Sequence, residues 1–138
     1  MRRGKRGGLP VPDEVQWQLL VVDDEPLLRG VVCDLLEYSI PGVRCRPAGG
    51  RDEATALLGQ GGIDQLVTEV RLSGANVSHW IGKTVARHPA LTVVVFSVEL
   101  PWLPGGLSDG GRVVHVEKSA TGLPGLADAC RALLSRAG

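Results

Sequence analysis

The stretch Gln18-Leu19-Leu20-Val21-Val22-Asp23-Asp24-Glu25-Pro26 sets an apolar run directly before two adjacent carboxylates and a proline. The apolar run is typical of a buried strand, and a proline is typical of the first turn of a helix. Two neighbouring aspartates repel each other unless a cation or a proton offsets the repulsion. The stretch therefore predicts a strand-to-helix junction that carries a divalent-cation or phosphoryl site. A simple helix cap, with Asp24 as the capping residue, is the alternative.

Outward from this junction, short apolar runs alternate with segments of helical periodicity. This alternation is typical of an α/β fold, in which a parallel sheet is wrapped by helices. Residues 71–74 have the composition of a loop. The expected strands are 19–22, 43–46, 63–70, 92–96 and 112–117, and the expected helices cover about 27–36, 52–59, 77–87 and 123–134.

The composition is that of one soluble domain: 138 residues, 43% hydrophobic and 22% charged. No apolar stretch approaches the roughly 18 residues that a membrane span requires. We expect a flexible basic arm over 1–16 and a folded domain over 17–138. The arm has no apolar segment typical of a secretory signal, which predicts a cytoplasmic protein. It also has few charges and no aromatic residues before residue 17, so a nucleic-acid partner is not expected.

The three cysteines lie far apart in the sequence, at Cys33, Cys45 and Cys130. Their number is odd and no two are separated by only two residues, so neither a disulfide framework nor a zinc site is indicated. We expect each thiol to fill space in the core as a small apolar group.

Polar side chains lie at, or directly after, the carboxyl ends of four of the expected strands. The carboxyl ends of parallel strands gather at one edge of the sheet, where such folds bind their ligands. Three carboxylates, a hydroxyl and an ammonium at one edge can hold Mg²⁺ and a phosphoryl group. These residues are Asp23, Asp24, Glu69, Ser97 and Lys118.

With these motifs the chain resembles the receiver domain of bacterial two-component response regulators over about 18–135. The matching segments are LLVVDDEP, VTEVRLSG, VVVFS and VHVEKS. The resemblance implies a flavodoxin-like, doubly wound fold, with five parallel strands in the order 2-1-3-4-5 and helices on both faces. It also implies a domain that is not itself an enzyme and that receives a phosphoryl group, with Mg²⁺, from a histidine kinase or a phosphotransfer protein.

The resemblance also implies a role for each matching position. Mg²⁺ would be held by the acidic pair, by the acceptor side chain and by a backbone carbonyl two residues beyond the acceptor. A lysine would pair with the acceptor, and a hydroxyl and a rotating side chain would report the modification. The corresponding positions here are Asp23 and Asp24, Glu69, the Arg71 carbonyl, Lys118, Ser97 and His115.

Glu69 departs from the family, which has aspartate at the acceptor position. The extra methylene moves the carboxylate on the order of 1.5 Å deeper into the site, whereas in-line attack tolerates about an ångström. We therefore expect weakened Mg²⁺ binding, an atypical receiver and signalling by protein–protein contact with an effector or in a homodimer. Two hypotheses follow: Glu69 mimics the modified state, or it merely neutralises Lys118 in a phosphorylation-independent docking module.

The segment between the fourth and fifth expected strands also differs from the pattern of the family. Residues 99–111 contain two prolines and four glycines, a composition that disfavours a helix. We expect the fourth helix of the family to be short or irregular here. Trp102 is expected to cover the last helix as a plug, with an exposed anchor for a partner as the alternative.

A small Mg²⁺-dependent phosphohydrolase with Asp23 as its nucleophile is the alternative from another class. Such enzymes need an acid two residues after the nucleophile, and Glu25 followed by Pro26 fits that pattern poorly. They also carry a cap domain for which this chain has no room.

The triplet Gly82-Lys83-Thr84 is similar to the end of a phosphate-binding loop. The glycine expected five residues earlier is Val77, and no strand leads into the triplet. A nucleotide-hydrolysing loop is therefore not indicated.

Overall fold

A five-stranded parallel sheet forms the centre of the molecule. The computed structural model describes residues 14–103, 111–119 and 122–137. The sheet order is β2-β1-β3-β6-β7, which is the predicted order 2-1-3-4-5. Its strands are β1 (Trp17–Val22), β2 (Val43–Ala48), β3 (Gln65–Thr68), β6 (Thr92–Ser97) and β7 (Val113–Glu117). The doubly wound, flavodoxin-like α/β fold is confirmed.

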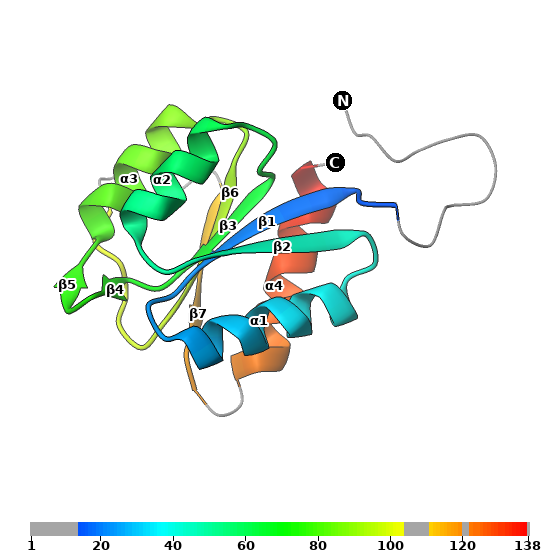
Figure 1. Ribbon diagram of the computed structural model, residues 1–138, viewed down its shortest axis with the longest axis horizontal. Helices are drawn as coiled ribbons and strands as arrows, with labels where there is room; N and C mark the ends of the chain where they lie inside the picture. Colours follow the sequence, from blue (N-terminus) through cyan, green and yellow to red (C-terminus); the bar gives the residue numbers. More distant parts are fainter. Residues whose placement is uncertain (1–13, 104–110, 120–121, 138) are drawn as a thin grey trace.

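Helices cover both faces of this sheet. Figure 1 shows α1 and α4 on one face and α2 and α3 on the other. Pro26 is the first residue of α1, where its missing N–H is not needed. The helices are α1 (Pro26–Ser39), α2 (Arg51–Gly59), α3 (Ser78–Arg87) and α4 (Gly122–Ala137). None of these described helices is long and apolar enough to cross a membrane.

The alternation of side chains along β1 divides the core into two halves. Leu19 and Val21 pack in the cluster that includes residues of α1 and α4. Leu20 and Val22 pack in the cluster that includes residues of α2 and α3. All four are almost completely buried, and burial of a leucine side chain contributes about 2 kcal/mol. The sheet is therefore held from both sides, which fixes the edge where its strands end.

The cysteines belong to the first of these halves. Cys45 and Cys130 are buried in the cluster beneath α1 and α4, and Cys33 packs against it. All three are free thiols. The prediction that they fill core space is confirmed.

A small hairpin replaces the loop expected at 71–74. β4 (Arg71–Leu72) and β5 (Ala75–Asn76) pair antiparallel. The two residues between them, Ser73 and Gly74, both have positive φ, at 52° and 80°. This is the requirement of a tight two-residue hairpin turn, which glycine meets easily and serine rarely.

The segment after β6 differs in part from expectation. Residues 98–103 and 111–112 form no helix, and the rest of the segment expected to be irregular, 104–110, lies outside the described residues. Trp102 is 70% exposed, and its backbone N–H donates to the Ser78 hydroxyl at the start of α3. The predicted plug over the last helix is therefore wrong, because the backbone bond fixes this loop beside α3. Of the predicted arm, only 14–16 are described.

Candidate functional site

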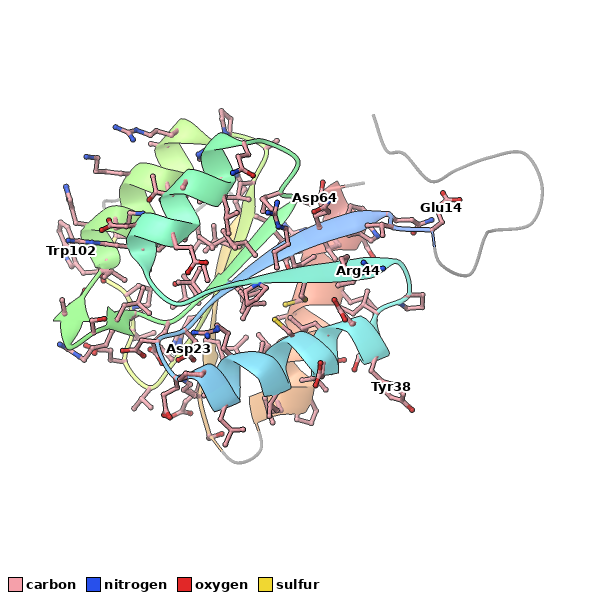
Figure 2. All side chains as sticks on the ribbon, viewed as in Figure 1. Glu14, Asp23, Tyr38, Arg44, Asp64 and Trp102 are labelled. Atoms are coloured by element: carbon pink, nitrogen blue, oxygen red, sulfur yellow. The ribbon has the colours of Figure 1, made fainter. Side chains whose placement is uncertain are left out.

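Strand register brings Asp23 and Glu69 side by side. Val22 in β1 pairs with Thr68 in β3, and each carboxylate follows its strand by one residue. The Glu69 N–H donates to the Val22 carbonyl at 3.2 Å. Figure 2 shows Asp23 where β1 passes into α1. The two acids therefore belong to the same edge of the sheet, as predicted from the strand ends.

Lys118 reaches both acids from the end of β7. Its backbone N–H donates to the Ser97 carbonyl at 3.0 Å, which fixes the residue at the same edge. Its Nζ lies 2.5 Å from Oε2 of Glu69 and 3.1 Å from Oδ2 of Asp23. The side chains of these three charged residues are only 20%, 12% and 7% exposed, in the order Lys118, Glu69, Asp23. We call them the Lys118 cluster.

The charge of Lys118 is stabilised by its neighbours. Burial alone would lower the pKa of its ammonium group, because burial disfavours the charged form. Hydrogen bonds to Glu69 and Asp23, and the charges of both, outweigh burial and raise the pKa above its ordinary value. Lys118 is therefore a cation at neutral pH and stands between two carboxylates.

Glu69 uses both of its carboxylate oxygens within the protein. Oε2 accepts from Lys118, and Oε1 accepts from the Val70 N–H at 2.9 Å. The longer side chain thus spans from the ammonium group to the backbone N–H of the next residue, Val70. Neither oxygen is without a donor.

The acidic pair divides into a buried and an exposed residue. Oδ1 of Asp23 accepts from the Glu25 N–H at 2.9 Å, and Oδ2 faces Lys118. Asp24 is exposed and accepts from the Ser73 N–H at 2.7 Å, which ties it to the hairpin. The N-cap residue, which precedes α1, is Glu25, and its side chain makes no capping hydrogen bond. The alternative that Asp24 serves as a simple helix cap is therefore wrong.

The predicted Mg²⁺ ligands line a common open pocket of about 380 Å³. Among the described residues, however, no three Asp, Glu, His or Cys side chains are grouped so that they could hold a metal ion. Lys118 is a cation at the position between Asp23 and Glu69. The residues present, as they are arranged, do not fit Mg²⁺, although Asp23, Asp24, Glu69 and Arg71 all line the pocket.

Ser97 and His115 contact each other rather than the carboxylates. Ser97 is fully buried, and its hydroxyl donates to the Glu99 carbonyl. The Nε2 atom of His115 lies 3.0 Å from the Ser97 carbonyl, so this nitrogen carries the proton and donates. No described hydrogen bond joins Ser97 to Glu69. The two predicted switch residues therefore form a pair of their own and do not line the pocket.

Glu99 is a pocket residue that the sequence patterns did not single out. Its carboxylate accepts from the Arg71 side chain at 2.9 and 3.4 Å and so joins the hairpin to the segment after β6. Arg71 also donates to the Gly74 carbonyl. One signal in the sequence was the position of Glu99, two residues after Ser97 and so near the end of a strand. The composition of the loop, however, does not predict that the Glu99 side chain points into the pocket.

The fold matches solved response-regulator receiver domains. A receiver domain protein from Clostridium thermocellum has a TM-score of 0.68 and 18% identity, covering 87% of this chain and 95% of that one. TrrA from Thermotoga maritima, solved in complex with Mg²⁺-BeF, has a TM-score of 0.70 and 20% sequence identity. This match covers 85% of this chain and 98% of TrrA. A CheY-like receiver domain protein from Methanospirillum hungatei has a TM-score of 0.72 and 14% sequence identity. This match covers 88% of this chain and 95% of that one. The chain has the fold of response-regulator receiver domains. No family model and no curated protein matches the sequence.

Proposed function

We propose that this chain is an atypical receiver domain of two-component signalling that acts by protein–protein contact and is not phosphorylated at Glu69. The receiver fold supports the signalling role. The observation that carries the atypical part is that Oε1 of Glu69 accepts from the Val70 N–H at 2.9 Å while Oε2 pairs with Lys118. Neither oxygen of this longer carboxylate is then free to accept the phosphoryl group.

Phosphoryl transfer to Glu69 would have to break two contacts. An attacking oxygen must be free and aligned with the donor to within about an ångström. Both oxygens of Glu69 accept hydrogen bonds from Lys118 and Val70. Mg²⁺ would also have to displace Lys118 from Asp23, since an ammonium and a divalent cation compete for the same oxygens. Mg²⁺ binding by this chain is therefore weak, and the site is closed to phosphorylation.

Of the two hypotheses for Glu69, the contacts favour a docking module. A mimic of the modified state would engage the hydroxyl of Ser97, and that hydroxyl donates to Glu99 instead. The cluster then serves to neutralise buried charge and to hold three strand ends together. The partner is an effector, a histidine kinase, a phosphotransfer protein or a second copy of this chain.

A phosphohydrolase is supported less well. Asp23 would be its nucleophile, but its two oxygens accept from Glu25 and Lys118. The proton-bearing side chain in described contact with Asp23 is Lys118, and its raised pKa makes it a poor general acid. A colorimetric phosphatase assay with Mg²⁺ is expected to give no signal above the blank.

Intact-mass spectrometry tests the proposal. The chain is incubated with Mg²⁺ and acetyl phosphate, in parallel with Glu69→Asp. We expect the wild type to stay unmodified, and the variant to gain about 80 daltons, one phosphoryl group, because the shorter side chain returns the carboxylate to the position that in-line attack requires. Glu69→Gln is the control, since an amide cannot accept a phosphoryl group. An adduct on the wild type that Glu69→Gln abolishes would overturn the proposal.

A further inference from the structure

A second pocket lies between α2 and α3, on the face of the sheet opposite α1 and α4. Its volume is about 300 Å³, and none of its lining residues lines the acidic pocket. Figure 1 shows the two helices side by side. The lining residues are Arg51, Asp52, Thr55 and Leu58 of α2, and His79, Trp80, Lys83, Thr84, Arg87 and His88 at α3.

The lining is strongly basic. Arg51, Lys83 and Arg87 are exposed, and none of them forms an ion pair with a carboxylate in the described part of the chain. Asp52 is the one acid among the lining residues. Lys83 and Arg87 are four residues apart on one helix face, where like charges destabilise a helix. Arg87, in the last turn of α3, is favoured by the helix dipole, but Lys83 in the middle of the helix is not, so its placement is not explained by helix stability.

Trp80 forms a fixed aromatic wall of this pocket. Its indole N–H donates to the Thr55 hydroxyl at 2.9 Å, which joins α3 to α2 and sets the plane of the ring. Part of the side chain packs against the core, and part stays accessible to solvent. A held aromatic ring next to cations offers stacking and charge in the same place.

We propose that this pocket binds a small phosphorylated ligand with a planar ring, the chemistry of a nucleotide. Lys83, Arg87 and Arg51 would hold the phosphates by charge-assisted hydrogen bonds. The ring of the ligand would stack on Trp80. The volume is at the lower end of the roughly 300–1,000 Å³ of ordinary ligand pockets. Three cations around one pocket are too few to follow a nucleic-acid strand, for which a longer basic track is needed.

The binding would differ from that of a phosphate-binding loop. Gly82-Lys83-Thr84 lies inside α3, and the Thr84 hydroxyl donates to the Trp80 carbonyl. Its backbone amides belong to the helix and its hydroxyl has a partner. Lys83 therefore acts from the side of the helix, and no hydrolysis is implied.

Isothermal titration calorimetry of the whole chain at low salt tests this site. The probes are the di- and triphosphates of adenosine and guanosine, with inorganic phosphate and adenosine as partial ligands. We expect at least one nucleotide to bind more tightly than either partial ligand. Lys83→Ala should weaken it about tenfold, the loss of one hydrogen bond to a charged group. Trp80→Leu should weaken nucleotide binding and leave phosphate binding unchanged.

Arg44→Ala is the matched control, because Arg44 is an exposed cation on β2 outside the pocket. It should bind as the wild type does, as should Glu69→Gln, which separates this site from the proposed function. Arg87→Ala replaces Lys83→Ala if circular dichroism shows that the latter is unfolded. The proposal is overturned if no nucleotide binds up to about 1 mM, or if Arg44→Ala loses as much affinity as Lys83→Ala. Binding of an acidic peptide, but of no nucleotide, with the same dependence on Lys83 would also overturn it in favour of a protein partner.

Discussion

The ammonium nitrogen of Lys118 lies 2.5 Å from Oε2 of Glu69, and this contact joins the end of β7 to the end of β3 across β6. Asp23 adds a third strand end at 3.1 Å. One cation thus stands where three strands of the sheet finish.

Glu69→Gln should lower the free energy of unfolding by about 1–2 kcal/mol, because a hydrogen bond between charged groups becomes one with a neutral amide. Urea unfolding followed by circular dichroism measures the change. Arg71→Ala is the comparison variant, because the Arg71–Glu99 ion pair that it removes is roughly half exposed. Its loss should lower the free energy of unfolding by under about 1 kcal/mol. A larger loss for Arg71→Ala than for Glu69→Gln would contradict the importance of the buried contact.

Lys118→Met should lower the free energy of unfolding by about 3 kcal/mol, which is more than Glu69→Gln does. It leaves Asp23 and Glu69 buried beside each other without a cation. The same unfolding experiment measures it. Equal stability of Lys118→Met and wild type would mean that the three charges do not depend on one another.

Mg²⁺ should stabilise Lys118→Met more than it stabilises the wild type. In the variant the carboxylates of Asp23 and Glu69 lose their ammonium partner, and a divalent cation can take its position. Thermal melts with and without millimolar MgCl₂ compare the two proteins, and CaCl₂ serves as a second cation. A rise in Tm on addition of MgCl₂ that is as large in the wild type as in Lys118→Met would show that Lys118 does not keep the cation out.

Stability at alkaline pH should depend on Lys118. Its pKa is raised in the folded state, so its contribution is complete below the ordinary value of 10.5 and is lost as the pH rises through the folded-state value. The stability difference between wild type and Lys118→Met should therefore shrink above about pH 10.5. Burial also raises the pKa of Cys130, to about 12, but this thiol is common to both proteins and its effect cancels in the difference.

Much of the fold was predictable because its signals are local. The apolar run at 19–22 and the helical spacing after Pro26 each lie within one element, and the strand ends then bring Asp23, Glu69 and Lys118 together. The hairpin was missed because it depends on the positive φ of Ser73, which no residue pattern predicts.

The direction of the side chains in the segment after β6 could not be predicted from the sequence either. Proline and glycine indicated irregular backbone there, but not that Trp102 would lie beside Ser78 of α3. Likewise the substitution at Glu69 predicted a displaced carboxylate, whereas its bond to the Val70 N–H required the geometry of the folded chain. Such contacts depend on tertiary packing and not on local sequence.

A beryllofluoride titration followed by amide NMR shows whether Glu69 closes the pocket to a phosphoryl group. Beryllofluoride with Mg²⁺ imitates a bound phosphoryl group, and TrrA was solved with it. We expect the amide signals of Ser97, Lys118 and Ser73 to stay unchanged in the wild type and to shift in Glu69→Asp. Equal shifts of these signals in the wild type would mean that the pocket accepts the ligand despite Glu69, and the proposed closed site would be wrong.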